Sequence, residues 1–236
     1  MLLARGEIVA NDHIALRAFD RGGCGMEQLG SCFERYGYTA RGSYRFEDKH
    51  LVAQHYEHPD SAHPRVFISE LLVDALSPAA QAVVDGLLTQ VQDGLSTRPD
   101  LPVSGRPWST TWSDWEQLRA ESEYAAWLAA FGYRANHFTV DVDRLNTVSG
   151  LAELNELLRA GGLALNESGG AIKGSPEVGL EQSSTLAGAV PVTLGGETRE
   201  IPGCYYEFAQ RHRGFSGFVT QSANTIFEST DVRDSR

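Results

Sequence analysis

The chain has 236 residues, and its 20 lysines and arginines stand against 31 aspartates and glutamates, which gives a formal net charge of −11. A surface this acidic repels phosphate backbones, so we exclude nucleic acid as a partner and expect a small-molecule substrate. No apolar run is long enough to cross a membrane and the start of the chain lacks the pattern of a signal peptide, so the sequence predicts a cytoplasmic protein with no membrane partner.

The first part of the chain predicts a strand, a helix and three more strands. Residues 11–19 alternate polar or small side chains with apolar ones, which is typical of a strand. Three short strands follow the helix, and the last of them carries Glu70. We expect residues 11–76 to form one βαβββ module. The helix is indicated by apolar side chains at three- and four-residue spacing, which are Met26, Leu29, Phe33 and Tyr36. The three short strands are predicted at residues 43–46, 51–56 and 66–71.

Residues 77–131 predict a helical connector. Ser77 followed by Pro78 favours the start of a helix, and an apolar stripe follows it. Ser113 and Glu116 match a capping box and predict a second helix. We expect both helices to pack outside the sheet.

The second part of the chain repeats the order of the first. Residues 135–142 alternate as a strand does, and a later strand at residues 204–209 carries Glu207. We expect residues 132–211 to form a second βαβββ module. Between these strands, a helix is indicated by Leu151, Leu154 and Leu158, and a further strand by residues 178–183.

The spacing between matching residues supports an internal repeat. His13 and His137 are 124 positions apart, whereas Glu70 and Glu207 are 137 positions apart. The second module therefore contains an insertion of 13 residues. Two glycine-rich segments can absorb it, residues 161–175 and residues 195–197.

These patterns predict an α+β fold in which two tandem modules form one curved sheet around a shared metal site. On this interpretation residues 1–236 act as a single functional domain. Residues 212–236 follow the last strand, and we expect them to close over the site with Gly214 and Gly217 as flexible points.

The candidate site follows from which side chains share a face of a strand. Residues two or four apart in a strand point the same way, so His13 and Arg17 share one face. A lone histidine in a strand is more often a structural residue than a ligand. Because His13 and His137 lie at corresponding points of a repeat, we expect them to meet, with Glu207 beside them. Two imidazoles and one carboxylate form the triad that leaves coordination positions open on non-haem Fe(II).

Four segments follow one another in the chain: NDHIALR at 11–17, GYRANHFT at 132–139, LEQSST at 180–185 and YYEFAQR at 205–211. In this order they resemble the 2-oxoadipate dioxygenase/decarboxylase family of the vicinal oxygen chelate superfamily, which also contains glyoxalase I. The resemblance covers nearly the whole chain and implies a glyoxalase-type fold. It implies that His13, His137 and Glu207 hold the metal and that Arg17 binds the substrate. Gln182 shares a strand face with Leu180 and Ser184 and is a candidate to hydrogen-bond the substrate, with a structural role at the edge of the core as the alternative.

The family resemblance implies an Fe(II)-dependent dioxygenase. It would use O2 to convert a 2-oxo dicarboxylic acid, 2-oxoadipate, into 2-hydroxyglutarate and CO2, as a step of lysine catabolism. Arg17 would clamp the carboxylate far from the metal, as arginine does with bidentate geometry. A homodimer is left open.

Two other functions remain as alternatives. A quartet of His13, Glu70, His137 and Glu207 would suit a glyoxalase I-type isomerase or lyase that uses Zn or Ni, with Glu70 as a fourth ligand. A metal-free ligand-binding module of the resistance-protein type would suit the acidic chain. The joint presence of two histidines and Glu207 argues against that module.

Overall fold

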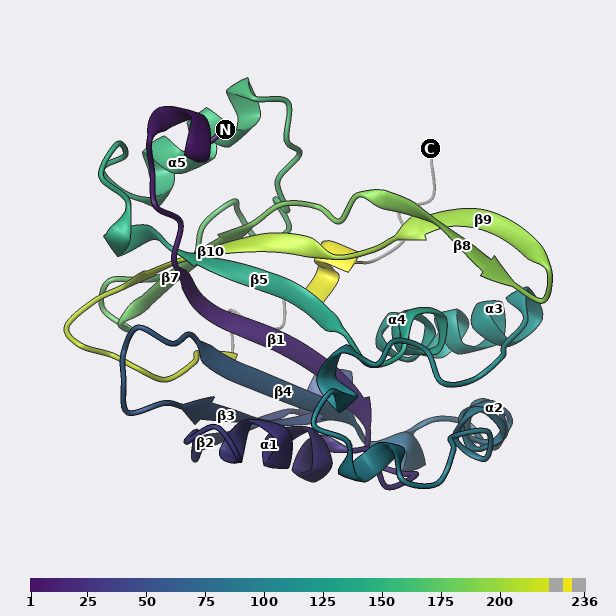
Figure 1. Ribbon diagram of the computed structural model, residues 1–236. Coiled ribbons are helices and arrows are strands. Elements are labelled where there is room, and N and C mark those ends of the chain that lie inside the picture. The colour runs from purple at the N-terminus through teal and green to yellow at the C-terminus, as the bar shows by residue number, and fades with distance from the viewer. Residues whose placement is uncertain (221–226, 231–236) are drawn as a thin grey trace.

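An eight-stranded mixed sheet runs through the molecule and curls around the predicted site (Figure 1). The computed structural model describes residues 1–220 and 227–230. The order across the sheet is β2-β3-β4-β1-β5-β10-β7-β6. These strands are β1 (Asn11–Phe19), β2 (Thr39–Phe46), β3 (Leu51–Glu57), β4 (Arg65–Leu71), β5 (Ala135–Asp141), β6 (Lys173–Ser175), β7 (Leu180–Ser184) and β10 (Tyr205–Arg211).

The two halves of this sheet have the same topology. β1 pairs in parallel with β4, and β5 pairs in parallel with β10, while β1 and β5 pair antiparallel with each other. The orders β2-β3-β4-β1 and β6-β7-β10-β5 are therefore related by an approximate twofold axis between β1 and β5. A helix follows the first strand of each half, α1 (Met26–Glu34) and α5 (Leu151–Ala160). The predicted α+β class is confirmed.

A two-stranded hairpin of β8 (Ala189–Leu194) and β9 (Glu197–Pro202) is inserted between β7 and β10. The sequence predicted only a turn here, so the two strands are a correction. Gly195 and Gly196 both have positive φ, as the tight turns of hairpins require. The hairpin packs against the connector, where the Trp112 indole donates to the Glu197 carbonyl at 2.9 Å. Most of the extra length of the second half is this hairpin.

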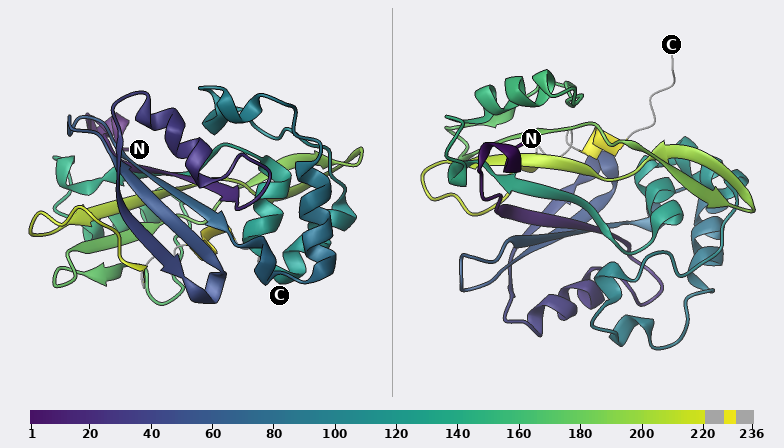
Figure 2. Two further views of the ribbon diagram at one scale, coloured as in Figure 1. Left: turned by 90° about the horizontal axis from the view of Figure 1, so that it is seen from below. Right: turned by 45° about the horizontal axis from the view of Figure 1, so that its top comes forward.

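The connector contains three helices that gather beside one end of the sheet (Figure 2). They are α2 (Pro78–Leu88), α3 (Trp112–Glu121) and α4 (Glu123–Phe131). Ser77 caps α2 as predicted, since its hydroxyl accepts from the Ala80 amide at 3.3 Å. The capping box predicted at Ser113 and Glu116 is wrong, because Thr111 and Asp114 form it instead. None of the helices in the described ranges has the length and apolar character needed to span a membrane.

Each half buries the outer face of its strands under its own helix. Leu16 of β1 and Leu29 of α1 belong to one apolar core. Phe208 of β10 and Leu154 of α5 belong to another. Because neighbouring residues of a strand point to opposite faces, the inner face of the same strands is left for other side chains. That inner face carries the buried polar residues His13, Arg17, His137, Thr139, Gln182, Ser184 and Glu207.

Candidate metal centre

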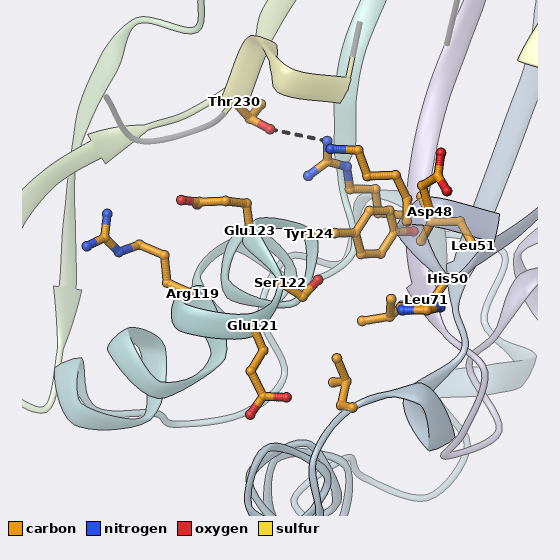
Figure 3. Close-up of a pocket in the computed structure, with 13 residues that line it drawn as sticks. Asp48, His50, Leu51, Leu71, Arg119, Glu121, Ser122, Glu123, Tyr124 and Thr230 are labelled. Carbon is orange, nitrogen blue, oxygen red and sulfur yellow. Dashed lines mark hydrogen bonds between the residues drawn. The ribbon is translucent and has the colours of Figure 1, made fainter. Parts of the chain in front are cut away.

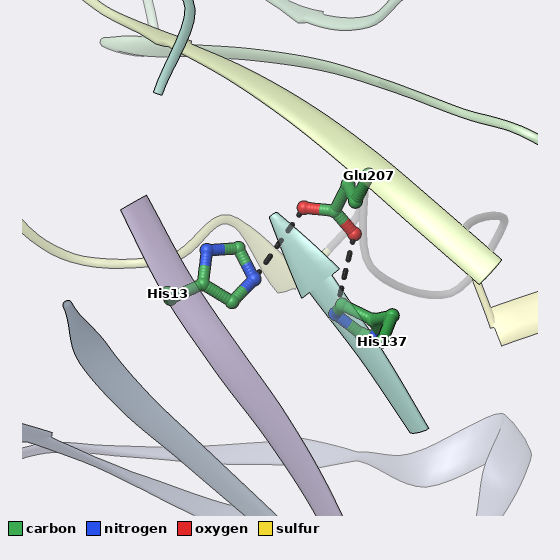
Figure 4. Close-up of side chains that lie close together, drawn as sticks. All are labelled: His13, His137 and Glu207. Atoms are coloured by element: carbon green, nitrogen blue, oxygen red, sulfur yellow. Dashed lines mark ion pairs between the residues drawn. The ribbon is translucent and has the colours of Figure 1, made fainter. Parts of the chain in front are cut away.

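The side chains of His13, His137 and Glu207 converge on one point inside the curled sheet (Figure 4). All three are buried, and one ligand atom from each lies within 4.8 Å of the others. His13 Nε2 is 3.4 Å from Glu207 Oε1, and His137 Nε2 is 3.5 Å from Glu207 Oε2. The two imidazole rings are 5.6 Å apart and nearly perpendicular. The structure thus brings together the three residues that the sequence singled out.

The strand register explains this convergence. In the antiparallel pair of β1 and β5, His13 stands opposite Thr139 and His137 stands opposite Ala15. In the parallel pair of β5 and β10, Glu207 stands beside Thr139. The histidines are therefore close to the twofold axis, and the glutamate is one strand away. Cross-strand neighbours of this kind lie about 5 Å apart, which brings their side chains within reach of one ion.

A β-bulge precedes each histidine. The pairing of β1 with β5 skips Asp12 on one strand and Asn136 on the other, at positions related by the twofold axis. A bulge redirects a side chain that would otherwise point to the opposite face. Asp12 Oδ1 lies 2.8 Å from His13 Nδ1, and Asn136 Oδ1 lies 3.1 Å from His137 Nδ1. Both Nδ1 atoms are thereby occupied, and both Nε2 atoms face the centre.

Glu207 is also held in place by neighbours. Gln182 on β7 donates from Nε2 to Glu207 Oε1 at 2.5 Å. Thr139 Oγ1 lies 3.0 Å from His13 Nε2. Gln182, predicted from the sequence as a substrate-binding residue, therefore contacts the carboxylate of the triad. Its role toward substrate stays a prediction.

Burial and nearby charges set the protonation of the site. Burial, with help from the charges of His13 and Arg17, lowers the pKa of His137 well below 6.5. Burial raises the pKa of Glu207, although the charge of His13 opposes this. Burial also acts to raise the pKa of Asp12, but hydrogen bonds from His13 and Arg211 hold it well below its usual value. A neutral His137 is the form that can ligate a metal.

The geometry of the triad fits a single divalent ion. Metal bonds from nitrogen and oxygen ligands are about 2.0–2.2 Å long, so adjacent ligand atoms on one ion lie roughly 3 Å apart. The two separations of 3.4 and 3.5 Å between imidazole and carboxylate atoms are close to this value. Each ligand has an outer partner that fixes its orientation, as metal ligands generally have. Two imidazoles and one carboxylate leave positions for further ligands.

Glu70 lies outside this cluster, which corrects the expectation that it could complete a quartet. Its Oε2 accepts from the backbone amide of Met26 at 2.9 Å, at the start of α1. In the register of β1 with β4, Glu70 stands beside Ala18, whose side chain belongs to the outer core. A carboxylate is favoured at the N-terminus of a helix, where backbone amides are unpaired.

Arg17 is buried on the same face of β1 as His13, with 3% of its surface exposed. Its guanidinium lies over the rings of Tyr124 and Trp127, at 4.7 and 5.0 Å from the ring centroids. Its Nη2 donates to Thr230 Oγ1 at 3.2 Å. The charge of Arg17 contributes to the low pKa of His137, so it acts on the triad.

Arg17 also lines a cavity of about 300 Å³. Figure 3 shows this cavity between the turn that carries His50 and the helices that carry Arg119 and Tyr124. Arg17 is the residue that this cavity shares with the inner face of β1, and the triad does not contribute to the lining.

Part of the expected closing segment can be placed. Phe218 packs against His13 with ring centroids 4.8 Å apart, and the turn Phe227–Thr230 reaches Arg17 through Thr230. The remainder of the predicted segment, residues 221–226 and 231–236, lies outside the described residues.

Sequence reasoning missed the partners of the histidines. Asp12 and Asn136 each stand directly before a histidine, and the repeat of a small acid or amide at that place was the available signal. Tyr124 and Trp127, which stack on Arg17, gave no signal that separates them from ordinary core aromatics.

Comparison with known proteins assigns the chain to a family. The family model described as 2-oxoadipate dioxygenase/decarboxylase matches residues 3–97 and 104–215. The chloroplastic 2-oxoadipate dioxygenase/decarboxylase of Arabidopsis thaliana is 37% identical over 254 residues, which covers 93% of this chain and 67% of that protein.

Solved structures agree. The hydroxyglutarate synthase of Oryza sativa, crystallised in complex with 2-oxoadipate, has a TM-score of 0.89 and 34% identity, covering 96% of this chain and 82% of that one. A protein of Shewanella frigidimarina NCIMB 400, provisionally described as a hydrolase, has a TM-score of 0.88 and 46% identity, covering 93% and 88%. A glyoxalase superfamily protein from Ralstonia eutropha JMP134, at 24% identity with a TM-score of 0.75 over 92% and 77% of the two chains, shares the fold. The predicted vicinal oxygen chelate-type fold is confirmed, and the chain belongs to the 2-oxoadipate dioxygenase/decarboxylase family.

Proposed function

We propose that this chain is an Fe(II)-dependent dioxygenase that oxidatively decarboxylates and hydroxylates a 2-oxo dicarboxylic acid. With 2-oxoadipate, the reaction consumes one O2 and yields 2-hydroxyglutarate and CO2. The observation that carries this proposal is the buried triad of His13, His137 and Glu207 with a buried arginine on the same face of the sheet. Family membership and the 2-oxoadipate complex of the rice protein support the choice of substrate.

His13, His137 and Glu207 would hold the ion, and this donor set suits Fe(II). When bound, iron supplies the redox chemistry that O2 requires and a Lewis acid for the oxygens of a 2-oxo acid. The protein supplies orientation. Asp12 and Asn136 fix the two imidazoles so that both Nε2 atoms face the centre. Burial keeps bulk water away from the reacting groups, which strengthens every charge interaction there.

Arg17 binds the carboxylate at the far end of the substrate. Four residues of strand separate the Cα atoms of Arg17 and His13 by about 13 Å. The arginine side chain and a six-carbon diacid can together span that distance. One carboxylate of the diacid would then bind Arg17 while its other end reaches the metal. The rings of Tyr124 and Trp127 hold the guanidinium in place, which lowers the entropy lost when substrate binds. In a chain of net charge −11, this buried cation favours an anionic ligand.

The two alternative functions have less support. A glyoxalase I-type isomerase would use a fourth carboxylate, and Glu70 instead binds the start of α1. A metal-free binding module has no use for two imidazoles whose Nε2 atoms face one carboxylate. The cytoplasmic location and the homodimer stay predictions.

The test is oxygen consumption by protein purified without metal and then loaded with Fe(II), Zn or Ni. We expect Fe(II) alone to support O2 uptake with 2-oxoadipate. With ¹⁸O2, both labelled atoms should appear in 2-hydroxyglutarate, because one enters its new carboxylate and the other its hydroxyl group, while the CO2 released from C1 stays unlabelled. The monoacid 2-oxohexanoate, which has the same number of carbons, is the matched control. Isomerase activity with Zn or Ni and no O2 uptake with Fe(II) would refute the proposal.

A further inference from the structure

Residues 212–218 follow β10, and we call them the segment below. Phe218 at its end lies against the proposed metal ligand His13. The Phe218 ring meets the His13 ring edge to face at 4.8 Å, and it also packs on Phe67 at 4.8 Å. The backbone amide of Phe218 donates to Tyr44 Oη at 3.2 Å. An aromatic side chain therefore covers His13 from the side of the first half of the sheet.

One arginine holds both this segment and the partner of His13. Arg211 ends β10, and its side chain is 11% exposed. It donates from Nε to Asp12 Oδ2 at 2.6 Å and from Nη2 to Asp12 Oδ1 at 2.9 Å. From Nη1 it donates to the carbonyls of Phe215 at 3.2 Å and Gly217 at 2.8 Å. Its guanidinium also lies 5.3 Å from the centroid of the Phe218 ring.

The planar fork of arginine makes this double attachment possible. Two of its edges point in fixed directions, so the carboxylate and the backbone carbonyls can be bound only in one relative position. Asp12 in turn lies 2.8 Å from His13 Nδ1. The chain of contacts runs from the segment, through Arg211 and Asp12, to the imidazole of His13.

We propose that Arg211 is a positioning residue that couples the seating of Phe218 over His13 to the orientation of the His13 imidazole. This inference rests on the metal site of the proposed function. With the segment seated, Arg211 fixes Asp12, and Asp12 fixes the Nδ1-protonated form of His13 with Nε2 toward the ion. With the segment released, the imidazole loses both its oriented partner and the ring that covers it.

Arg65 on β4 provides a matched control. Its Nη1 lies 3.2 Å from the same Asp12 Oδ2, so it also places positive charge beside that carboxylate. Its other ion-pair partner in the described part of the chain is Glu57 on β3. Arg65 itself makes no hydrogen bond or ion pair with the segment in the described residues, although its partner Glu57 bonds Ser216. Arg65→Gln thus removes a cation from Asp12 and leaves the carbonyl contacts of the segment in place, whereas Arg211→Gln removes both.

The experiment compares the wild-type protein with these two variants in three measurements. Backbone hydrogen exchange of residues 212–218 in metal-free protein reports the seating of the segment. The ¹⁵N chemical shifts of His13 report which ring nitrogen carries the proton. Titration with Co²⁺ alone, followed by its visible absorption, reports metal affinity and ligand geometry. Thermal melting confirms that each variant is folded.

We expect Arg211→Gln to speed exchange of the segment by about tenfold or more and to shift the His13 tautomer. We expect it to weaken Co²⁺ binding by about 10- to 100-fold, the usual effect of losing an outer partner of a metal ligand. Arg65→Gln should leave exchange of the segment at the wild-type rate. If the glutamine variant does not fold, Arg211→Lys replaces it. An ammonium has three N–H donors and no rigid fork, so it cannot make all four hydrogen bonds of Arg211, and the segment should again exchange faster.

Coupling is overturned if Arg211→Gln frees the segment while the His13 tautomer and the Co²⁺ affinity stay within twofold of wild type. It is equally overturned if the segment exchanges at the wild-type rate in that variant. The proposed function fails separately, if Fe(II)-loaded wild-type protein takes up no O2 with 2-oxo acids. Because exchange and tautomer are measured without metal, they decide the role of Arg211 in either case.

Discussion

Glu70 and Glu207 occupy equivalent strands in the two halves of the sheet but point to opposite faces. Glu207 stands beside Thr139 in the pair of β10 with β5, and the twofold axis relates Thr139 to Ala15. The residue beside Ala15 on β4 is Phe67, three positions before Glu70. An odd shift along a strand reverses the face of a side chain. The counterpart of Glu207 in the first half of the sheet is therefore Phe67.

This relationship predicts different results for one substitution at two sites. Glu207→Gln replaces a carboxylate ligand by an amide and should weaken Co²⁺ or Fe(II) binding by more than the roughly 10- to 100-fold that loss of an outer partner costs. Glu70→Gln keeps an oxygen acceptor for the Met26 amide and should leave metal affinity within twofold. Metal titration of both purified variants checks this. Equal losses of affinity in the two variants would restore Glu70 as a ligand.

The position of Arg17 leads us to predict that 2-oxo diacids are turned over in preference to 2-oxo monoacids. Arg17→Met removes the charge of the side chain and keeps an apolar chain in its place, and metal should still bind because Arg17 is not one of the three ligands. The loss of a hydrogen bond to a charged group, about 1.5–3 kcal/mol, should lower kcat/KM for 2-oxoadipate by about 10- to 100-fold. Turnover of 2-oxohexanoate should fall much less. Arg119→Met is the control, since Arg119 lines the same cavity from α3. A parallel fall for both acids in the Arg17 variant would contradict the clamp.

His55 predicts that the protein loses stability on acidification. Burial lowers the pKa of His55 below 6.5. Tyr44 Oη accepts from the Phe218 amide and lies 2.8 Å from His55 Nδ1, so its hydroxyl proton points to a neutral imidazole. As the pH falls through 6.5, the unfolded chain takes up a proton at His55 before the folded chain does, which favours unfolding.

The measurement is the melting temperature of metal-free protein between about pH 7.5 and pH 5.5. Wild type should lose more stability over this range than His55→Gln, which has no such proton to bind. The low pKa of Glu57 acts in the same direction but below 4.5, outside the range tested. Identical dependence of the melting temperature on pH in the two proteins would show that His55 does not cause the loss of stability.

Two helical glycines predict opposite effects of the same change. At Gly30 in α1, a Cβ would overlap the hydroxyl of Tyr56. At Gly86 in α2, a Cβ would meet nothing within 4 Å. Gly86→Ala should therefore stabilise the protein by about 0.5–1 kcal/mol through helix propensity, whereas Gly30→Ala should destabilise it by about 1–3 kcal/mol through overpacking. Denaturant unfolding of both variants measures the two signs, and a gain in stability at Gly30 would show that Tyr56 moves aside.

The sequence predicted the parts of the structure that depend on local pattern or on repetition. The alternation at 11–19 and the cap at Ser77 are local signals, and both were confirmed. The repeat also predicted that His13 and His137, 124 positions apart, would lie close together. Equivalent residues of two modules are related by the axis between them, and these two lie beside it.

The features that the sequence could not predict depend on the register in which the strands pair. Matching Glu70 to Glu207 needed an insertion whose place was unknown, and an error of three residues chose the wrong face. The bulges at Asp12 and Asn136 are invisible without the pairing of the strands. The hairpin around Gly195 contacts the indole of Trp112, which is distant in the sequence, and no local pattern reveals that contact.

Phe67 affects how many protein ligands the two repeated modules can offer to a metal ion. A perfectly symmetric pair of modules would present two histidines and two carboxylates and would enclose an ion with four protein donors. With Phe67 on one side and Glu207 on the other, the twofold symmetry is broken at the positions that would supply the two carboxylates. An ion held by this triad would keep room in its coordination sphere for molecules that the protein does not provide. The two modules supply matching histidines, and the phenylalanine in place of a second carboxylate would leave the proposed metal centre open to substrates.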